Sequence, residues 1–549
     1  MSSFFLKPWI LFYLLPFVGG LLYSMGFPMK DLPHFMGYSF LGIFFLFISL
    51  SLPYSREASQ KLYERKLYQK LLTGLVFCAG HCLSGYYWIP YTLNEFGSVP
   101  FPINTLLGLL FSLIIMPQLL VFILLIHMWS KLNFKSSKLA GNIYSRNVLL
   151  ALLFTLLDRF IPQQFPAHIG HTWLSLAPNL GLAPLFGVPL FSFMSYWFIL
   201  SFTSLWRTKK IDFLAIGAFL CFVILNFIFP LQWNPENDSS PTRLRLVQAN
   251  VGNFMKLQSE SGDQRSIQEI YKSYLNLSTR GAQAPIDLVI WPETAYPQLL
   301  NSAILRMNPS FVPSLVQQTT SLSVAPLFFG GYDKSKEEDG NYYETEYNAA
   351  FLINKEGTFN DVYHKQLLIP FGEGLPFGPL NPYLAKVIKN ISYFARGNRF
   401  TQFKLENKKT FIAAICYEIL FSSYIRDFLN EQRDTDFLIN LTNDSWYGRT
   451  SEPFQHQFLT HWRAVEFNIP IVRMTNTGIS SLLYPDGSES RRLKLFTESV
   501  LDIDLHTPER SPTLWQSYGF LSFFIIAILC FLFALIFETK IYRPSLKRS

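Results

Sequence analysis

The sequence has little cysteine, and its cysteines are poorly placed for disulfide bonds. Four of the five lie inside long apolar segments, namely Cys78, Cys82, Cys221 and Cys530. Cys416 therefore has no disulfide partner in the polar part of the chain. An unpaired thiol in such a place is either inert core or part of a catalytic site. Residue type alone leaves both open, because free cysteine is among the most buried residues.

Histidine is also sparse, and no group of potential metal ligands stands out. The nine histidines are scattered over 549 residues, without the close spacing of ligands that metal sites show. We therefore expect no metal site. The formal net charge of +8 would raise the question of nucleic-acid binding in a soluble protein. Because most of this charge lies in short segments between apolar runs, we expect no nucleic-acid partner.

Apolar residues, by contrast, are abundant. They make up 50% of the chain, and 54 residues are phenylalanine. Runs of about 20 apolar residues, the length that crosses a bilayer as a helix, recur along the sequence. We expect eight membrane helices, near residues 9–27, 35–52, 70–90, 104–130, 147–164, 182–206, 211–230 and 514–537. The first run lacks a convincing signal-peptide cleavage site and is followed by further spans, so it is expected to stay as a helix.

Lysine and arginine are distributed unevenly between the segments that join these runs. One set of segments carries Lys7; Arg56, Lys61, Arg65, Lys66 and Lys70; Lys131, Lys135, Lys138 and Arg146; Arg207, Lys209 and Lys210; and Lys540, Arg543, Lys547 and Arg548. The other short loops carry only Lys30 and Arg159. Because positively charged short loops stay in the cytoplasm, both termini are predicted to be cytoplasmic and residues 231–513 to be exported.

This orientation predicts four parts of the chain. Residues 1–230 form a transmembrane domain of seven helices, and residues 231–513 form a periplasmic domain. The eighth membrane helix spans 514–537, and a basic cytoplasmic tail covers 538–549. The protein is thus expected to be a multi-pass protein of the inner, cytoplasmic membrane.

The exported part has the pattern of an α/β domain. Strands are expected near 243–251, 286–291, 326–331, 347–354, 410–416, 436–441, 470–474, 479–484 and 499–504. Helices are expected at 262–280, 310–322, 419–431 and 453–468. Several strands are continuous apolar runs, as in sheets covered on both faces. The pattern does not distinguish a doubly wound sheet from a two-sheet sandwich.

Three polar residues stand where apolar runs end in this domain. Cys416 ends the run Phe411-Ile-Ala-Ala-Ile, and Glu293 ends Ile286-Asp-Leu-Val-Ile-Trp-Pro. Lys365 lies near the Pro-Phe-Gly-Glu373 turn. A cysteine has a pKa of about 8.5 and attacks as thiolate, so it needs a nearby base or cation. The pattern supplies a base, a cation and a thiol.

These motifs resemble the nitrilase (carbon–nitrogen hydrolase) superfamily, and within it the apolipoprotein N-acyltransferase branch. Further details of that branch are Val247-Gln-Ala-Asn250, Cys416-Tyr-Glu418, Asn443-Asp-Ser-Trp-Tyr-Gly448, Trp462-Arg-Ala-Val-Glu466 and Arg473-Met-Thr-Asn-Thr-Gly478. The resemblance covers nearly the whole chain and implies an αββα sandwich for the exported domain, beside the all-α membrane bundle.

The resemblance also implies roles for single residues. Glu293 would be the base, Cys416 the nucleophile, and Lys365 a charge-stabilising cation. Lys365 and the backbone N–H of Tyr417 would stabilise the oxyanion of acyl transfer. Glu373 and Glu418 would be supporting carboxylates, although the residues alone favour a surface glutamate at a strand end for each.

The implied reaction joins this site to the membrane. A phospholipid would acylate Cys416 in a thioester, and the free α-amino group of an N-terminal diacylglyceryl-cysteine of an apolipoprotein would then take the acyl chain. No cofactor is expected, because a thioester is already activated, and the enzyme is expected to act as a monomer in a Gram-negative envelope. One alternative is a membrane-bound amidohydrolase that uses water as acceptor. Another is a non-catalytic transporter or scaffold, which would not need the three residues.

Two positions depart from the family's pattern. Leu257 stands where the family usually has a tryptophan, so the lipid contact of that indole is in doubt. Ala249 replaces a glycine of the Gln-Gly-Asn motif. We expect this methyl group to be tolerated if Ala249 has a negative φ.

Overall fold

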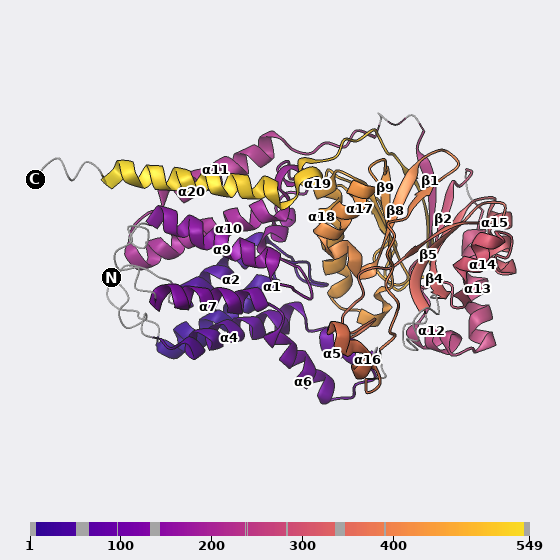
Figure 1. Ribbon diagram of the computed structural model, residues 1–549, viewed down its shortest axis with the longest axis horizontal. Coiled ribbons are helices and arrows are strands. Elements are labelled where there is room, and N and C mark those ends of the chain that lie inside the picture. Colours follow the sequence, from indigo (N-terminus) through magenta and orange to yellow (C-terminus); the bar gives the residue numbers. More distant parts are fainter. Residues whose placement is uncertain are drawn as a thin grey trace, which may run out of the picture. The chain divides into compact units, whose positions relative to one another are not determined.

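A computed structural model describes residues 7–50, 65–95, 97–131, 143–235, 238, 240–281, 284–334, 346–388 and 391–542 (Figure 1). Several predicted cytoplasmic charges lie outside these ranges, namely Arg56, Lys61, Lys135, Lys138, Arg543, Lys547 and Arg548. The chain forms two compact units. The first comprises Met1–Pro90, Pro100–Leu231 and Thr513–Ser549, and the second comprises Tyr91–Val99 and Gln232–Pro512.

All the regular secondary structure described in the first unit is helical. Its longer helices are α1 (Leu15–Ser24), α2 (Met36–Ser49), α4 (Leu67–Gly85), α6 (Ile103–Leu110), α7 (Pro117–Lys131), α9 (Ile143–Phe160), α10 (Ala183–Thr208), α11 (Phe213–Ile228) and α20 (Phe520–Tyr542). Shorter helical segments are η1 (Ile10–Leu14), η3 (Phe111–Leu113), η5 (Ile169–Ser175) and α19 (Leu514–Tyr518). The short helix α5 (Ile89–Glu95) begins in this unit, and its residues from Tyr91 on belong to the second. A helix is thus present at each expected membrane span.

Among the described residues, three helical stretches are long and apolar enough to cross a membrane. They are Ile103–Lys131, Ala183–Thr208 and Phe520–Thr539. Shorter apolar helices cover Ile10–Ser24, Met36–Ser49 and Phe213–Ile228. A membrane part is therefore established by length and composition, whereas the full count of eight spans stays a prediction.

Glycines let the first helices of this unit approach closely. A Cβ atom on Gly20 of α1 would lie 2.0 Å from the carbonyl oxygen of Phe77 in α4. One on Gly42 of α2 would lie 2.4 Å from the carbonyl oxygen of Gly19 in α1. Small residues at such contacts are typical of membrane helix pairs, where backbone proximity and dispersion replace the hydrophobic effect.

The second unit contains two β-sheets. The first has the order β12-β1-β2-β4-β5-β6, with β3 paired to β4, and the second has the order β11-β10-β9-β8-β7. The strands of the first are β1 (Thr242–Gln248), β2 (Leu288–Ile290), β3 (Leu299–Leu300), β4 (Leu327–Lys334), β5 (Glu346–Ile353), β6 (Phe359–His364) and β12 (Ser499–Leu505). Those of the second are β7 (Gln402–Lys404), β8 (Thr410–Ile415), β9 (Phe437–Thr442), β10 (Ile471–Thr475) and β11 (Ser481–Leu483). The strands β1-β2-β4 and β8-β9-β10 are parallel, β3 is also parallel to β4, and the remaining pairs of both sheets are antiparallel.

Neighbouring side chains on β4 show how the sheets are layered. The ring of Phe328 lies 5.0 Å from the rings of both Phe403 and Phe411 in the second sheet. The next residue, Phe329, packs 5.7 Å from Trp291 in a separate buried cluster that includes the first-sheet helices. Because successive side chains of a strand point to opposite faces, one face of the first sheet meets the second sheet and the other meets helices.

Helices complete the two outer layers of this unit. Those of the first-sheet half are α12 (Asn253–Glu260), α13 (Gln264–Ser278), α14 (Ser302–Met307) and α15 (Ser314–Ser323), and those of the other half are α17 (Ser422–Glu431) and α18 (Glu452–Phe467) (Figure 1). The short helix α16 (Asn381–Ala385) lies in the connection between β6 and β7. The architecture is the αββα sandwich, and the doubly wound single sheet is wrong.

All nine expected strands and all four expected helices of this domain are present, within a few residues. The described structure adds the strands β3, β6 and β7 and the helices α12, α14 and α16. Strand β6 has the sequence Phe-Asn-Asp-Val-Tyr-His, in which polar residues interrupt the apolar run that marks the other strands. The sequence-based prediction did not include β6, although this strand leads directly into Lys365.

Candidate active site

The predicted catalytic residues lie where strands of both sheets end. Glu293 follows β2 closely, Lys365 comes directly after β6, and Cys416 comes directly after β8. Ligand sites of α/β folds form at the carboxyl ends of strands, where the connecting loops meet. The Nζ atom of Lys365 lies 3.4 Å from Oε1 of Glu293, so the two strand ends do converge.

The backbone at this place is unusual, because residues at three strand ends have left-handed conformations. Asn250 after β1 has φ 53°, Thr294 after β2 has φ 47°, and Cys416 has φ 50°. Asparagine tolerates this region, but a β-branched threonine rarely adopts it. Such conformations cost on the order of 1–3 kcal/mol each and persist where the surrounding structure holds them. Ala249 is not among these residues, so its methyl group causes no backbone strain, as expected.

Lys365 is completely buried and is held between two carboxylates. Its Nζ donates to Oε1 of Glu373 at 2.8 Å, in addition to the contact with Glu293. Burial alone would lower the pKa of Lys365, but the adjacent Glu373 and Glu293 carboxylates outweigh it and raise the pKa. Lys365 therefore remains an ammonium ion throughout the range in which proteins function, as a charge-stabilising residue must.

Glu293 receives further donors that fix its carboxylate. Asn348 Nδ2, on β5, donates to Oε1 of Glu293 at 2.8 Å and lies 3.1 Å from Oε1 of Glu373. The backbone N–H of Asn443, just past β9, donates to Oε2 of Glu293 at 2.9 Å. The carboxylate is thus oriented by groups from both sheets, with Lys365 beside it.

Cys416 is 5% exposed and lies within the field of these charges. Burial, and then the negative charge of Glu293, raise the pKa of the Cys416 thiol well above its usual value, while Lys365 opposes them. The resting thiol is consequently protonated. A reaction at this sulfur requires a base that removes the proton as the bond to the substrate forms, and Glu293 is the carboxylate at hand.

Glu418 joins the loop after Lys365 to the strand before Cys416. Its Oε1 accepts from the backbone N–H groups of Gln366 at 2.7 Å and Leu367 at 3.1 Å. Its Oε2 accepts from the N–H of Ile415 at 2.8 Å. The hydroxyl oxygen of Tyr363 lies 2.9 and 2.8 Å from the two oxygens and donates its single proton to the carboxylate. This single buried carboxylate therefore ties together the two segments that carry Lys365 and Cys416.

The structure thus brings together the residues that the motifs indicated. Glu373 and Glu418 are 7% and 0% exposed, so the alternative that they are surface glutamates is wrong. Tyr417 follows Cys416 in the short helix η8 (Cys416–Leu420). Leu257, on α12, is 48% exposed.

Several site residues were not assigned a role from the sequence. Asn348 is the polar residue that precedes the apolar stretch Ala-Ala-Phe-Leu-Ile of β5. A polar residue next to such a stretch could have been predicted as a site residue from the sequence. Asn440 lies inside the fully buried strand β9, and its Nδ2 lies 3.5 Å from the carbonyl oxygen of Cys416. His456 lies on α18 with Nε2 3.3 Å from the same oxygen. No local pattern predicts either contact, because both depend on how helix and strand pack in space.

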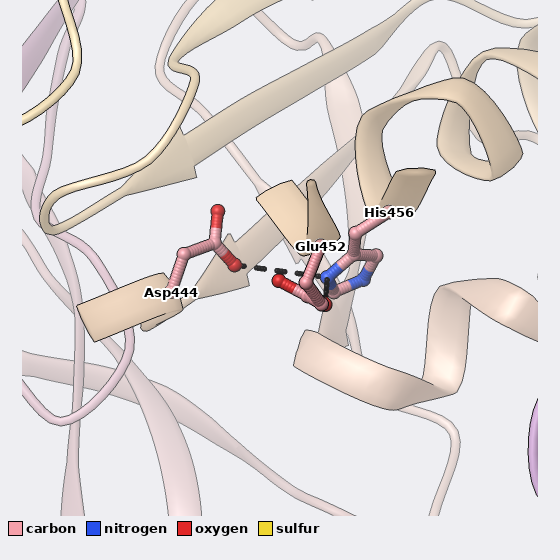
Figure 2. Close-up of side chains that lie close together, drawn as sticks. All are labelled: Asp444, Glu452 and His456. Carbon is pink, nitrogen blue, oxygen red and sulfur yellow. Dashed lines mark ion pairs between the residues drawn. The ribbon is translucent and has the colours of Figure 1, made fainter. Parts of the chain in front are cut away.

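One group of described side chains has the donor types of a metal site. Asp444, Glu452 and His456 are buried, and one ligand atom of each lies within 4.8 Å of the others (Figure 2). Asp444 is also paired with Arg473, whose Nη2 lies 3.0 Å from Oδ2. A guanidinium ion in this position disfavours a divalent cation, because the two positive charges would share one carboxylate.

The family follows from comparison with known proteins. The second unit has the character of a carbon–nitrogen hydrolase, since residues 243–511 match the family model "Carbon-nitrogen hydrolase". Residues 19–201 match the model "Apolipoprotein N-acyltransferase N-terminal domain". The apolipoprotein N-acyltransferase of Bdellovibrio bacteriovorus is 34% identical over 435 residues, 76% of either chain. That of Rickettsia prowazekii is 26% identical over 522 residues, 91% of this chain and 97% of its own.

The chain belongs to the apolipoprotein N-acyltransferase family, the enzymes of lipoprotein N-acylation. The family indicated by the sequence motifs is therefore confirmed. A solved amidase from Nesterenkonia sp. aligns with 49% of this chain and 91% of its own at 17% identity and a TM-score of 0.34. That score is too low to carry an argument about the site.

Proposed function

We propose that this enzyme moves an acyl chain from a phospholipid to the α-amino group of an N-terminal diacylglyceryl-cysteine through a thioester on Cys416. The observation that carries the proposal is the completely buried Lys365, whose Nζ lies 2.8 Å from Glu373 and 3.4 Å from Glu293. The charges of Lys365 and Glu293 act on the buried thiol of Cys416. This arrangement has a protonated nucleophile, a base and a fixed cation, which is what acyl transfer through a thiol needs.

In the first half-reaction Glu293 removes the proton of the Cys416 thiol while sulfur attacks the ester carbonyl carbon of the phospholipid. The oxyanion that forms accepts from Lys365 and from the backbone N–H of Tyr417. Loss of one such donor typically costs about 2.7–4 kcal/mol of transition-state stabilisation. The carbon–oxygen bond of the ester then breaks, and Glu293 returns the proton to the departing lysophospholipid oxygen. The acyl group remains on sulfur.

In the second half-reaction the neutral α-amino group attacks the thioester carbon, and Glu293 takes one proton from the nitrogen. The carbon–sulfur bond breaks, and the proton passes from Glu293 to the sulfur. An amide and the resting thiol result. No energy source besides the thioester is consumed, so the reaction needs no cofactor.

The apolar helices place this enzyme in a membrane, where lipid substrates are present. The relatives that match are named for apolipoproteins, and a membrane part places the enzyme where phospholipids are the abundant acyl donors. We place both termini in the cytoplasm and residues 231–513 in the periplasm, because the basic loops favour that orientation.

The proposal is tested by the fate of the acyl group. Purified enzyme given phospholipid alone should release one equivalent of lysophospholipid and then stall, with one acyl adduct on Cys416 in intact-mass spectra. Addition of a diacylglyceryl-cysteinyl peptide should restart turnover with ping-pong kinetics. The acyl-enzyme persists because an apolar site excludes water from the thioester. Steady release of free fatty acid without the peptide would identify a hydrolase instead.

Variants of the three residues separate their roles. Cys416→Ala should abolish the adduct. Glu293→Gln and Lys365→Met should leave a folded protein in which adduct formation falls by on the order of 10²-fold or more, because proton transfer and oxyanion stabilisation are lost. A normal rate of transfer in any one of these variants would remove that residue from the mechanism.

A further inference from the structure

A buried ionic cluster adjoins the segment that carries Cys416. Asp444 on η9 (Asp444–Tyr447), Glu452 and His456 on α18, and Arg473 on β10 are between 0% and 7% exposed. Figure 2 shows the first three side chains converging, with the His456 ring between the carboxyl groups and the body of its helix. Nothing in the acyl-transfer steps above uses these residues, although His456 contacts the nucleophile's own carbonyl group.

Both ring nitrogens of His456 face oxygen atoms that accept hydrogen bonds while the two carboxyl groups are ionised. Nδ1 lies 3.7 Å from Oδ1 of Asp444 and 3.5 Å from Oε1 of Glu452. Nε2 lies 3.3 Å from the backbone oxygen of Cys416. A neutral imidazole carries one N–H and would leave a lone pair against one of these acceptors, whereas an imidazolium ion carries two. The geometry therefore favours the charged ring.

The charges of the cluster balance when His456 is an imidazolium ion. Two carboxylates, Asp444 and Glu452, then face two cations, His456 and Arg473. Burial and Arg473 would lower the pKa of His456, but the nearby carboxylates of Asp444 and Glu452, which lie 3.7 and 3.5 Å from Nδ1, outweigh these effects and raise it. Burial of an ion is tolerated where partners of opposite charge surround it, and this cluster meets that condition without a metal ion.

The carbonyl oxygen of Cys416 has a second side-chain donor from the same network. Asn440 Nδ2 lies 3.5 Å from it, and Oδ1 of Asn440 accepts from Nη1 of Arg473 at 2.7 Å. Arg473 is also the partner of Asp444. Arg473 is therefore linked to the carbonyl oxygen of Cys416 by two chains of contacts. One passes through Asp444 and His456, and the other passes through Asn440.

We propose that His456 is a positioning residue of this enzyme, which as an imidazolium ion donates from Nε2 to the carbonyl oxygen of Cys416 and holds the nucleophile in its left-handed backbone conformation. The proposal rests on the proposed role of Cys416 as nucleophile. A residue with φ 50° needs support from its surroundings, and the carbonyl group is the part of Cys416 that His456 and Asn440 can hold while sulfur stays available.

The proposal fixes the sign of a pH dependence. The charged groups that face the ring are Glu452 from its own helix, Asp444 from η9 and Arg473 from β10. Tyr447, which lies near Glu452 and Asp444, stays neutral because burial raises its pKa well above the usual range. A raised imidazole pKa means that the support is present below the ordinary histidine value and is lost as pH rises through the folded-state value. Below about pH 6, protonation of Glu452, whose pKa burial raises to about 6, removes one counter-charge.

The test compares two variants of His456 with a control on the same helix. In His456→Leu the rate at which phospholipid acylates Cys416, followed by intact mass, should fall by on the order of 10²-fold, because a misplaced reacting group typically causes such a loss. The phospholipid concentration that gives half the maximal rate should stay unchanged. In His456→Gln, which keeps a donor, much of the rate should return, and the loss of rate at high pH should disappear. His461→Gln changes a second histidine of α18 and should behave as the wild type. If His456→Gln is as slow as His456→Leu, or if His456→Leu keeps the wild-type rate, the proposal is wrong.

A second readout does not depend on acyl transfer. In protein labelled with ¹⁵N-histidine, the ring signals of His456 should show two protonated nitrogens at neutral pH. These signals are assigned by their loss in His456→Gln. In a separate measurement, the rate of Cys416 alkylation by iodoacetamide should change in His456→Leu but not in His461→Gln. If the wild type forms no acyl adduct at all, the proposed function fails while these measurements still decide the role of His456. A neutral ring at pH 7, or a stoichiometric metal ion in the purified protein whose removal slows alkylation, would overturn the imidazolium assignment.

Discussion

The buried carboxylates of the site are compensated in two different ways. Glu293 and Glu373 share the ammonium group of Lys365, so their charge is met by an opposite charge. Glu418 is met by neutral donors, namely three backbone N–H groups and the hydroxyl of Tyr363. Burial raises the pKa of Glu418, and the backbone hydrogen bonds together with the charge of Lys365 only partly offset this effect. The first arrangement suits the proposed acyl transfer, whereas the second joins the two segments that carry Lys365 and Cys416.

This difference predicts the effect of Glu418→Gln. An amide keeps one acceptor oxygen but turns the other into a donor, which would face the N–H of Ile415 or those of Gln366 and Leu367. At least one buried N–H loses its partner, at a cost of about 1–3 kcal/mol in the free energy of unfolding. Thermal unfolding should show this loss, and Cys416 acylation should slow by up to about 10²-fold because the segments shift. The control Glu431→Gln changes an exposed glutamate of α17 and should alter neither quantity; equal effects of the two substitutions would contradict the assigned role of Glu418.

At the scale of secondary structure, the sequence predicted the elements that are apolar and missed those that are not. The runs ending at Glu293 and Cys416 are buried strands of the two sheets, β2 and β8, so the continuous apolar runs identified both the strands and the residues at their ends. Strand β6 escaped because Asn360 and Asp361 interrupt its apolar pattern. Sandwich and doubly wound folds share the same alternation of elements, so only the pairing of strands distinguishes them.

The supporting residues of the site could not be predicted for a different reason. Asn348 and His456 lie inside a strand and a helix, respectively, and each acts on a group that is far away in the sequence. Their neighbours in the sequence give no sign of this. Resemblance to a family supplied the roles of Glu293, Lys365 and Cys416, but the ionic cluster around His456 emerges only from the packing of α18 against the strands.

Strand β4 also positions Glu293, through a glycine. A Cβ atom on Gly330 would lie 2.6 Å from both Cα of Glu293 and the backbone nitrogen of Thr294. The N–H of Gly330 donates to the carbonyl oxygen of Pro292 at 3.1 Å. The strand therefore lies directly against the turn that carries Glu293, the proposed base, and the absence of a side chain at Gly330 is what allows this approach.

Gly330→Ala should accordingly move Glu293 away from its partners. Backbone atoms must shift to admit the methyl group, which typically costs about 1–3 kcal/mol, and acylation of Cys416 should slow by on the order of 10²-fold. Gly331→Ala is the matched control, because its Cβ would meet no atom closer than 3.5 Å, an ordinary contact. The rates of adduct formation and the unfolding temperatures of the two variants give the comparison. A Gly330→Ala enzyme as fast as Gly331→Ala would show that the turn tolerates displacement.

At the scale of the whole molecule, the chain combines a helical unit with an α/β sandwich. The described helices of the first unit include three that are long and apolar enough to span a membrane, and the family match of residues 19–201 places this unit within the apolipoprotein N-acyltransferases. A soluble acyltransferase would need its lipid substrates delivered to it. An enzyme with its own membrane part can take acyl donors from the bilayer in which it resides, which explains why the two units occur in one chain.

The orientation of the two units across the membrane gives the final prediction. Basic short segments are retained in the cytoplasm, so Lys210, which is exposed after α10, should lie inside, and Glu431, exposed at the end of α17, should lie outside. The labelling uses a Cys221→Ser background, which removes the exposed native cysteine. A membrane-impermeant maleimide applied to intact spheroplasts should label Glu431→Cys rapidly. It should label Lys210→Cys only after the membrane is permeabilised. Cys416 reacts slowly in both because it is 5% exposed, and the parent without either substitution measures that background. The reverse pattern would place the sandwich in the cytoplasm, where its thioester chemistry could not reach an exported lipoprotein.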